Sequence, residues 1–330
     1  MTVRARAPCR IDLSGGTLDL WPLYLLIEQA ATVNLAIDLY TEAVITESED
    51  NRFHVCERES GRELASGAFE DLVEVPGAEI TGRLLGFFKP ASPLTVSIHS
   101  EAPPQAGLGA SSSLGISIAG ALNAVAGFRY RARDLVSIVR DVEVEVLGTL
   151  TGAQDHYPSV YGGAMCLWWE KLRHRREPLE VDLWAFERRF SLAYSHQPHR
   201  SGATNWEVVR RFLDGDRGTR SAVAESGKTA VAVRDALVRG DLDRVAELTG
   251  RDWECRRLMA PAVSSPELEK IIHTAREAGS TGVKVCGAGG GGCMIVAAPE
   301  EARSKVNEAI TRAGASIIDY HVAERGLTLF

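Results

Sequence analysis

The sequence predicts a mixed α+β fold divided into two lobes. In its first half, apolar and polar residues partly alternate, most cleanly at 93–100, as in strands that bury one face. Its second half carries mainly helical periodicity, between 204 and 278. At 330 residues the chain is long enough for two lobes that each bury a core. We place the boundary in the charged stretch 171–178, which gives lobes of residues 1–175 and 176–330.

Each element is predicted from a local pattern. In the first lobe the chain extends over 2–13 to a Ser-Gly-Gly turn, and a helix follows with Pro22 in its first turn. The first lobe is expected to contain strands at 2–13, 31–47, 52–57, 93–100 and 161–169 and helices at 21–27, 114–126 and 133–147. The second lobe is expected to contain strands at 190–195, 283–286, 293–297 and 317–322 and helices at 204–213, 222–238, 242–257, 266–278 and 299–313.

The composition limits the possible partners and the compartment. With 45% hydrophobic and 25% charged residues the chain is in the ordinary globular range. Its net charge of -7 argues against nucleic acid or an anionic membrane as partner. The six cysteines show no Cys-x-x-Cys pair, so neither a disulfide framework nor structural zinc is indicated. Without an apolar signal core or a membrane-length apolar stretch, we expect a cytoplasmic protein.

A glycine- and serine-rich loop precedes the helix at 114–126. Its residues of interest are Pro104, Gly107, Leu108, Gly109, Ala110, Ser111, Ser112 and Ser113. Glycines let the backbone approach a ligand, N–H groups at a helix start attract anions, and a serine hydroxyl there can ligate Mg²⁺. The same residues also suit a plain serine N-cap after a turn. The loop is neither a Walker A nor a Rossmann sequence, so other motifs must decide.

A second glycine-rich loop, residues 287–292, lies between two expected strands and has five glycines in six positions. Such a run costs backbone entropy that a plain hairpin turn does not require. We therefore expect this loop to pass close to a ligand or to another loop.

Acidic residues flank the end of the helix over 133–147. Glu143 and Glu145 lie near its end, and Asp155 follows a glycine turn. Phosphoryl transfer to an alcohol can use one carboxylate for Mg²⁺ and another to accept the hydroxyl proton. A helical glutamate can equally belong to a solvated face.

In this order the motifs resemble those of the GHMP kinase superfamily, named for galactokinase, homoserine kinase, mevalonate kinase and phosphomevalonate kinase. Residues 7–16, 104–113 and 284–292 match its first, second and third motifs. The third motif and the stretch 152–157 look most like the D-glycero-D-manno-heptose 7-phosphate 1-kinases. The resemblance implies ATP and Mg²⁺ as cofactors, a ribosomal protein S5 domain 2-like N-terminal lobe and a ferredoxin-like C-terminal lobe, with the active site between them.

The resemblance also implies catalytic roles. Ser111 matches the second serine of the family loop and would hold Mg²⁺ together with Glu143, while Ala110 takes the place of the first serine. Asp155 matches the catalytic base. Arg10 stands where sugar-kinase members carry an arginine and mevalonate kinases a lysine, and its planar fork would hold the base and the phosphoryl group. The implied reaction is phosphorylation of a sugar hydroxyl. The resemblance to the heptose kinases indicates the anomeric C1 hydroxyl of a heptose 7-phosphate as the acceptor.

A further set of residues is expected to hold the sugar: Gly15, Gly16, Asp19, Asp155, Arg200, Gly289 and Gly290. Asp19 takes roughly the place of a family aspartate that binds sugar hydroxyls, but heptose kinases usually read Gly-Gly-Gly-Thr-Asp there, so the identity of the sugar stays open. Arg200 opens a helix and could bind a substrate phosphate. Alternatively, it is an ordinary surface arginine.

Three other functions stay open at this stage. The first is a kinase of another small alcohol, such as a galactose-like free sugar, mevalonate or homoserine. The second is a catalytically silent sensor of sugar and nucleotide. The third, a dinucleotide-dependent oxidoreductase, is disfavoured because the run 287–292 precedes a strand instead of opening a helix. A small-molecule substrate is the expected partner, and the sequence does not decide between monomer and homo-oligomer.

Overall fold

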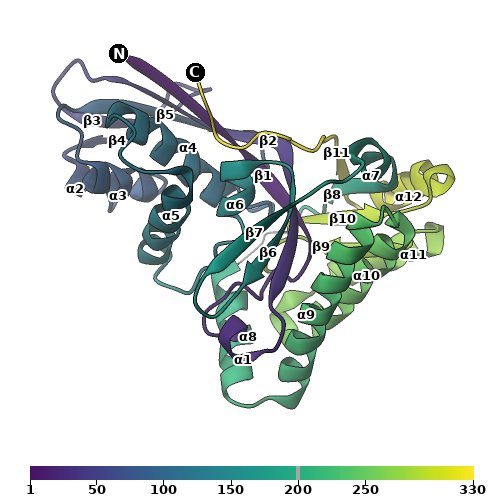
Figure 1. Cartoon of the computed structure of the whole chain (residues 1–330). Coiled ribbons are helices and arrows are strands. Elements are labelled where there is room, and N and C mark those ends of the chain that lie inside the picture. The colour runs from purple at the N-terminus through teal and green to yellow at the C-terminus, as the bar shows by residue number, and fades with distance from the viewer. Residues whose placement is uncertain (198–200) are drawn as a thin grey trace.

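The computed structural model of the chain has two lobes, each with one sheet and helices packed against it (Figure 1). It describes residues 1–197 and 204–330, together with the backbone of 201–203 as part of a helix. The expected α+β class is confirmed. Within these ranges no helix combines the length and apolarity needed to cross a bilayer.

The first lobe contains a sheet with eight strands in the described residues. They are β1 (Thr2–Ser14), β2 (Ala31–Glu47), β3 (Phe53–Glu57), β4 (Glu63–Gly67), β5 (Leu94–Ser100), β6 (Ala164–Trp169), β7 (His174–Leu179) and β12 (Thr328–Leu329). The order is β12-β1-β2-β5-β3-β4, and β6 pairs with both β2 and β7. Strands β3 and β5 run parallel, whereas the other pairs are antiparallel.

The two long strands β1 and β2 extend from the first lobe into the junction with the second. Ala5 and Ala7 of β1 pack in the core of the first lobe, whereas Cys9, Ile11 and Leu13 pack in a second cluster that includes strands and helices of the C-terminal half. Because the far end of β1 is covered on both faces, it is buried throughout its last eight residues. Polar residues at this end of β1 therefore lie at the lobe junction.

Helices of the first lobe are α1 (Leu23–Leu26), α2 (Phe69–Leu72), α3 (Glu79–Phe88), α4 (Ala110–Val125), α5 (Ala132–Leu147) and α6 (His156–Tyr161). As expected from its small apolar residues, α4 is mostly buried, and it packs on β1 and β2. The helix expected over 21–27 is only the short α1. The chain has to extend again after Ile27 to enter β2.

The second lobe contains a four-stranded antiparallel sheet in the order β11-β8-β10-β9. Its strands are β8 (Phe190–Tyr194), β9 (Gly282–Val285), β10 (Cys293–Ala297) and β11 (Ser316–Ile318). Its helices are α7 (Leu183–Arg189), α8 (Ser201–Leu213), α9 (Arg217–Val238), α10 (Leu242–Met259), the 3₁₀ turn η1 (Pro261–Val263), α11 (Pro266–Ala278) and α12 (Glu300–Arg312).

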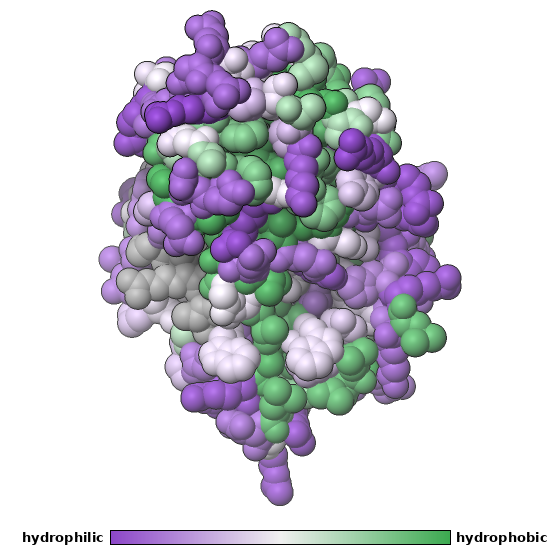
Figure 2. Space-filling view, turned by 90° about the vertical axis from the view of Figure 1, so that its left-hand side faces the viewer, coloured by the Kyte–Doolittle hydropathy of each residue, from purple (hydrophilic) through white to green (hydrophobic). Residues whose placement is uncertain are grey.

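The expected boundary between the lobes falls inside a strand of the first sheet. Residues 175 and 176 lie inside β7, which pairs with β6 and continues the first sheet. The last strand, β12, returns from the second half of the chain to pair with β1, so the two termini lie close together (Figure 1). On the face seen in Figure 2, polar side chains surround an apolar strip that runs down the lower middle, and further apolar patches lie in the upper part.

Candidate active site

A cavity of about 290 Å³ lies between the lobes. All three sequence motifs reach its walls: Arg10 and Gly16 from the first, residues 105–112 from the second, and Gly287 from the third. Asp19, Glu143 and Asp155 line it too. The fold therefore gathers most of the predicted site residues around one cavity.

The loop at 107–109 presents free backbone donors to this cavity. Gly107 and Gly109 both have φ near +70°, a conformation that favours glycine, and Gly109 is the N-cap residue of α4. No described residue accepts a hydrogen bond from the N–H groups of residues 107–109. Consecutive free N–H groups at a helix start form a suitable site for phosphate oxygens.

The second glycine loop passes close to the first, which is one of the two alternatives that the sequence left open. A Cβ on Gly287 would lie 2.9 Å from the carbonyl oxygen of Gly107, and one on Gly292 would lie 2.5 Å from that of Ala106. The N–H of Cys293 also donates to Ala106 O at 2.7 Å. Glycine is therefore needed here because two backbones meet.

The predicted substrate residues Gly289 and Gly290 are placed differently from Gly287. The N–H of Gly290 donates to Val263 O at 2.6 Å, and a Cβ on Gly289 would lie 2.6 Å from the same oxygen, so both glycines pack on η1. At the cavity wall this loop contributes Gly287 and Ala288.

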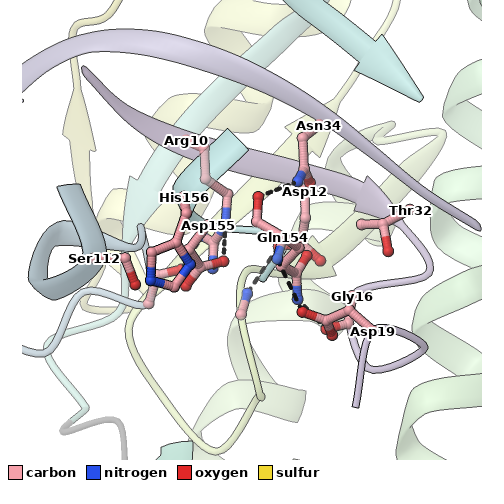
Figure 3. A network of polar contacts seen from close by, with 12 residues as sticks. Arg10, Asp12, Gly16, Asp19, Thr32, Asn34, Ser112, Gln154, Asp155 and His156 are labelled. Atoms are coloured by element: carbon pink, nitrogen blue, oxygen red, sulfur yellow. Dashed lines mark hydrogen bonds and ion pairs between the residues drawn. The ribbon is translucent and has the colours of Figure 1, made fainter. Parts of the chain in front are cut away.

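Arg10 and Asp155 form an ion pair at the centre of the cavity wall (Figure 3). Arg10 Nε and Nη2 lie 2.8 and 2.7 Å from Asp155 Oδ1, and Arg10 Nη1 donates to Gly107 O at 2.5 Å. Burial alone would lower the pKa of Arg10, but Asp155 and Asp12 raise it above its ordinary value. The side chain of Asp155 remains 26% exposed, so the pair leaves this carboxylate accessible from the cavity.

Glu143 forms a second polar group beside the start of α4. Its carboxylate accepts hydrogen bonds from Ser112 Oγ at 3.0 and 2.8 Å, and His156 Nε2 lies 3.0 Å from Oε2. Although burial alone would raise it, His156, Ser112 and Ser111 hold the pKa of Glu143 below its ordinary value. The deprotonated carboxylate and the adjacent hydroxyls are hard oxygen ligands of the kind that suit Mg²⁺.

The metal-binding capacity of these groups is partial. Among residues 1–197 and 204–330, no group of three or more His, Cys, Asp or Glu side chains is arranged to hold a metal ion. Mg²⁺ is often bound by one or two protein oxygens together with phosphate oxygens. Glu143 with Ser111 and Ser112 fits that pattern, and Ser111 is the exposed member of the three.

Asp19 and Gln154 form the side of the cavity opposite Ser112 (Figure 3). The N–H of Gln154 donates to Asp19 Oδ2 at 3.0 Å, its amide Nε2 donates to Gly16 O, and Asn34 Nδ2 donates to Gln154 O at 3.0 Å. Burial, assisted by the nearby Asp155, raises the pKa of Asp19 to about 7, although the Gln154 N–H acts in the opposite direction. Asp19 can therefore both accept and donate hydrogen bonds near neutral pH.

Sequence reasoning missed a buried charged network below the cavity. Asp12 and Lys284 form a fully buried ion pair between β1 and β9, and Lys284 Nζ lies 4.0 Å from Asp252 Oδ2. Asp252 accepts from Ser226 Oγ at 2.6 Å, and Arg256 on the same helix donates to Gly287 O. For Asp12 and Lys284 the only signal in the sequence was a charged residue inside an apolar segment.

Two other predicted residues lie outside the cavity wall. Gly15 lies outside the cavity wall, where its N–H donates to Asp252 Oδ1 at 3.3 Å. Pro104 also lies outside it, and its carbonyl accepts from Tyr194 at 3.4 Å. Arg200 falls outside the described residues. The second lobe instead contributes Asn205 of α8 to the cavity, a residue that no motif indicated.

Comparison with known proteins decides the family. The model for the GHMP kinases N terminal domain matches residues 75–163, and that for the GHMP kinases C terminal matches residues 233–316. A mevalonate kinase of Methanothermobacter thermautotrophicus is 30% identical, over 91% of this chain and 91% of that protein. This chain belongs to the GHMP kinase family.

Other GHMP kinases are similar over almost the whole chain. A D-glycero-alpha-D-manno-heptose 7-phosphate kinase of Campylobacter jejuni is 26% identical, over 99% of this chain and 98% of that protein. A D-glycero-D-manno-heptose 1-phosphate kinase from Bacteroides thetaiotaomicron shares the fold with a TM-score of 0.78 at 19% identity, over 99% and 98% of the two chains. Lactococcus lactis galactokinase, solved with galactose, has a TM-score of 0.77 at 17% identity, over 99% and 95%. The predicted family, two-lobed fold and kinase class are confirmed.

Proposed function

We propose that this protein is an ATP- and Mg²⁺-dependent sugar kinase that phosphorylates the anomeric hydroxyl of a sugar phosphate such as a heptose 7-phosphate. The observation that carries the proposal is the Arg10–Asp155 pair between the free N–H groups of 107–109 and the hydroxyl-binding pair Asp19 and Gln154. The similarity to the heptose 7-phosphate kinase of Campylobacter jejuni supports the substrate class.

Asp155 is proposed to act as the base. Its carboxylate is held by Arg10, whose own position is fixed by Gly107 O, and it stays open to the cavity. An anomeric hydroxyl is more acidic than an ordinary alcohol, so a carboxylate base is sufficient to take its proton. Arg10 also places a positive charge next to the base, where it would stabilise the negative charge on the phosphoryl group during transfer.

The nucleotide and metal are proposed to bind on the α4 side of the cavity. The N–H groups of 107–109 and the start of α4 would hold phosphate oxygens, and Glu143 with Ser111 would hold Mg²⁺. When bound, Mg²⁺ neutralises charge on the phosphates. Ser112 and His156 orient the Glu143 carboxylate toward this side.

A free sugar is the second candidate substrate, and the charge of the cavity favours it. Among the described residues that line the cavity, Arg10 is the cationic side chain, and it is already paired with Asp155. Asp19 and Glu143 add further carboxylates to the wall. A phosphate distant from the reacting hydroxyl would therefore depend on residues such as Arg200.

The test is ATP consumption with matched pairs of free and phosphorylated hexoses and heptoses. We expect turnover with at least one sugar and a preference for a heptose 7-phosphate over the free heptose. A reversed preference would establish the free-sugar alternative. Turnover only with mevalonate or homoserine, or none with any alcohol, would reject the proposed function.

A further inference from the structure

Gly287, at the cavity wall, is held on both sides by buried charged side chains. Its N–H donates to Asp12 Oδ1 at 2.8 Å, and its carbonyl oxygen accepts from Arg256 Nη2 at 3.3 Å. Asp12 lies on β1 in the first lobe and Arg256 on α10 in the second. The orientation of this backbone segment is therefore fixed from both lobes.

The geometry of the peptide group directs the next N–H away from Arg256. The carbonyl of Gly287 and the N–H of Ala288 belong to one peptide group, which is not among the cis bonds of the chain. In a trans peptide these two groups point in opposite directions. Arg256 is fully buried on the carbonyl side, whereas Ala288 lines the cavity. No described residue accepts a hydrogen bond from the Ala288 N–H.

Arg256 is a buried cation behind this wall and has no contacting carboxylate among the described residues. No carboxylate of the described residues lies within 4.0 Å of it, and its only other hydrogen-bond partner among them is Met259 Sδ at 3.7 Å. Burial lowers the pKa of Arg256, while the more distant Asp252, Asp12 and Asp19 oppose this effect. A buried cation without a contacting anion is costly, and an anion arriving on the far side of the Gly287–Ala288 peptide would offset part of that cost.

We propose that the Gly287–Ala288 peptide is a phosphoryl-binding element: the Ala288 N–H donates to a phosphoryl oxygen, and Arg256 and Asp12 act as positioning residues that set its direction. The element rests on the proposed kinase function and adds a backbone donor next to the loop at 107–109, beside Gly107. The phosphoryl group has two possible sources, the nucleotide or a phosphate already on the sugar.

Backbone amide signals distinguish this inference from the proposed function. Ala288 and Ala110 both line the cavity, so protein labelled with ¹⁵N-alanine reports both, with signals assigned through Ala288→Gly and Ala110→Gly. We expect both amides to shift downfield on addition of Mg²⁺ and tripolyphosphate. A shift of Ala288 with heptose 7-phosphate alone would also support the inference and assign the anion to the sugar.

Two other outcomes would overturn it. If the Ala110 amide shifts with tripolyphosphate while the Ala288 amide responds to neither anion, the inference fails, and the proposed phosphate site at 107–109 is still supported. If neither amide responds to either anion, both the inference and the proposed phosphate site fail.

Kinetics test the positioning role of Arg256. We expect Arg256→Met to lower kcat by about 10-fold or more with little change in KM for ATP, because one positioned donor contributes on the order of 10²–10³ to such reactions. Arg256→Lys should recover part of the loss. Arg234→Met, which breaks a pair between α9 and Glu177 of β7, is the control for losing an arginine. Equal kcat values in folded Arg256→Met and Arg234→Met would reject the positioning role of Arg256. If Arg256→Met does not fold, the amide shifts of Ala288 and Ala110 decide whether the peptide binds a phosphoryl group.

Discussion

Replacing Lys284 by Met should destabilise the protein strongly, because it leaves Asp12 as an uncompensated charge at the lobe junction. Both side chains are fully buried. Although burial alone would raise it, Lys284 and Arg10 hold the pKa of Asp12 below its ordinary value. Breaking a buried pair by removing one partner costs about 3–5 kcal/mol. This is a large share of the roughly 5–15 kcal/mol by which proteins are stable.

The expected change in melting temperature follows from the chain length. At roughly 2.1 cal/mol/K per residue, unfolding of 330 residues has an entropy of about 0.7 kcal/mol/K, so the loss corresponds to about 4–7 °C if the lobes unfold together. Thermal melting and urea unfolding measure it. In the double variant Asp12→Asn with Lys284→Met, the neutral amide can still accept from Gly287, so we expect the free energy of unfolding to recover by about 1–3 kcal/mol.

The pH dependence has a definite sign. In the wild type the lowered pKa of Asp12 adds stability that is present above its unfolded value and is lost as the pH falls below about 4. Without Lys284 the carboxylate is disfavoured, so the deficit of the variant should be smaller at pH 5 than at pH 8. The reasoning would be refuted if Lys284→Met lost less than about 1 kcal/mol of the free energy of unfolding at pH 8. It would also be refuted if the loss in the double variant equalled the sum of the losses in the two single variants.

Three further predictions concern the cavity. Glu143→Gln should raise the Mg²⁺ concentration for half-maximal activity by about 10-fold or more, because the charge is lost while Ser112 can still donate to the amide oxygen; an unchanged Mg²⁺ titration would exclude Glu143 as a ligand. Ser111→Ala should shift the Mg²⁺ titration more than Ser112→Ala in assays at limiting metal, because the Ser112 hydroxyl is already used by Glu143; the reverse order would make Ser112 the metal hydroxyl. The raised pKa of Asp19 should make the free energy of unfolding fall as the pH rises from about 4 through about 7. Asp19→Asn should remove this fall, as measured by urea titrations at several pH values. If the free energy of unfolding of Asp19→Asn changed with pH in parallel with that of the wild type, the shifted pKa would be contradicted.

The sequence predicted the features that depend on local patterns. Alternation and helical periodicity located most strands and helices, and the glycine loops were recognised because a short run of residues carries their chemistry. Backbone entropy predicted that residues 287–292 pass close to a ligand or to another loop, and the structure places Gly287 against Gly107. The helix predicted over 21–27 was too long, since local propensity does not show how soon the chain must re-enter the sheet.

The positioning residues could not be predicted because their partners are far away in the chain. Asp12 and Lys284 are 272 positions apart, and a lysine in a strand is ordinarily taken for a solvent-facing residue. Asp252 and Arg256 stand four residues apart on α10, a spacing that also occurs on solvated helix faces. Their burial follows only from the packing of α10 against the lobe junction, which no local pattern encodes.

Transfer of labelled phosphate from ATP to a sugar, followed for the wild type and Asp155→Asn, tests the central claim most directly. Asn can still accept a hydrogen bond from Arg10, so the fold and nucleotide binding should change little. We predict that the wild type forms a sugar 1-phosphate and that kcat of the variant falls by about 10²–10⁴, the contribution of a general base. Undiminished transfer by Asp155→Asn would contradict the account.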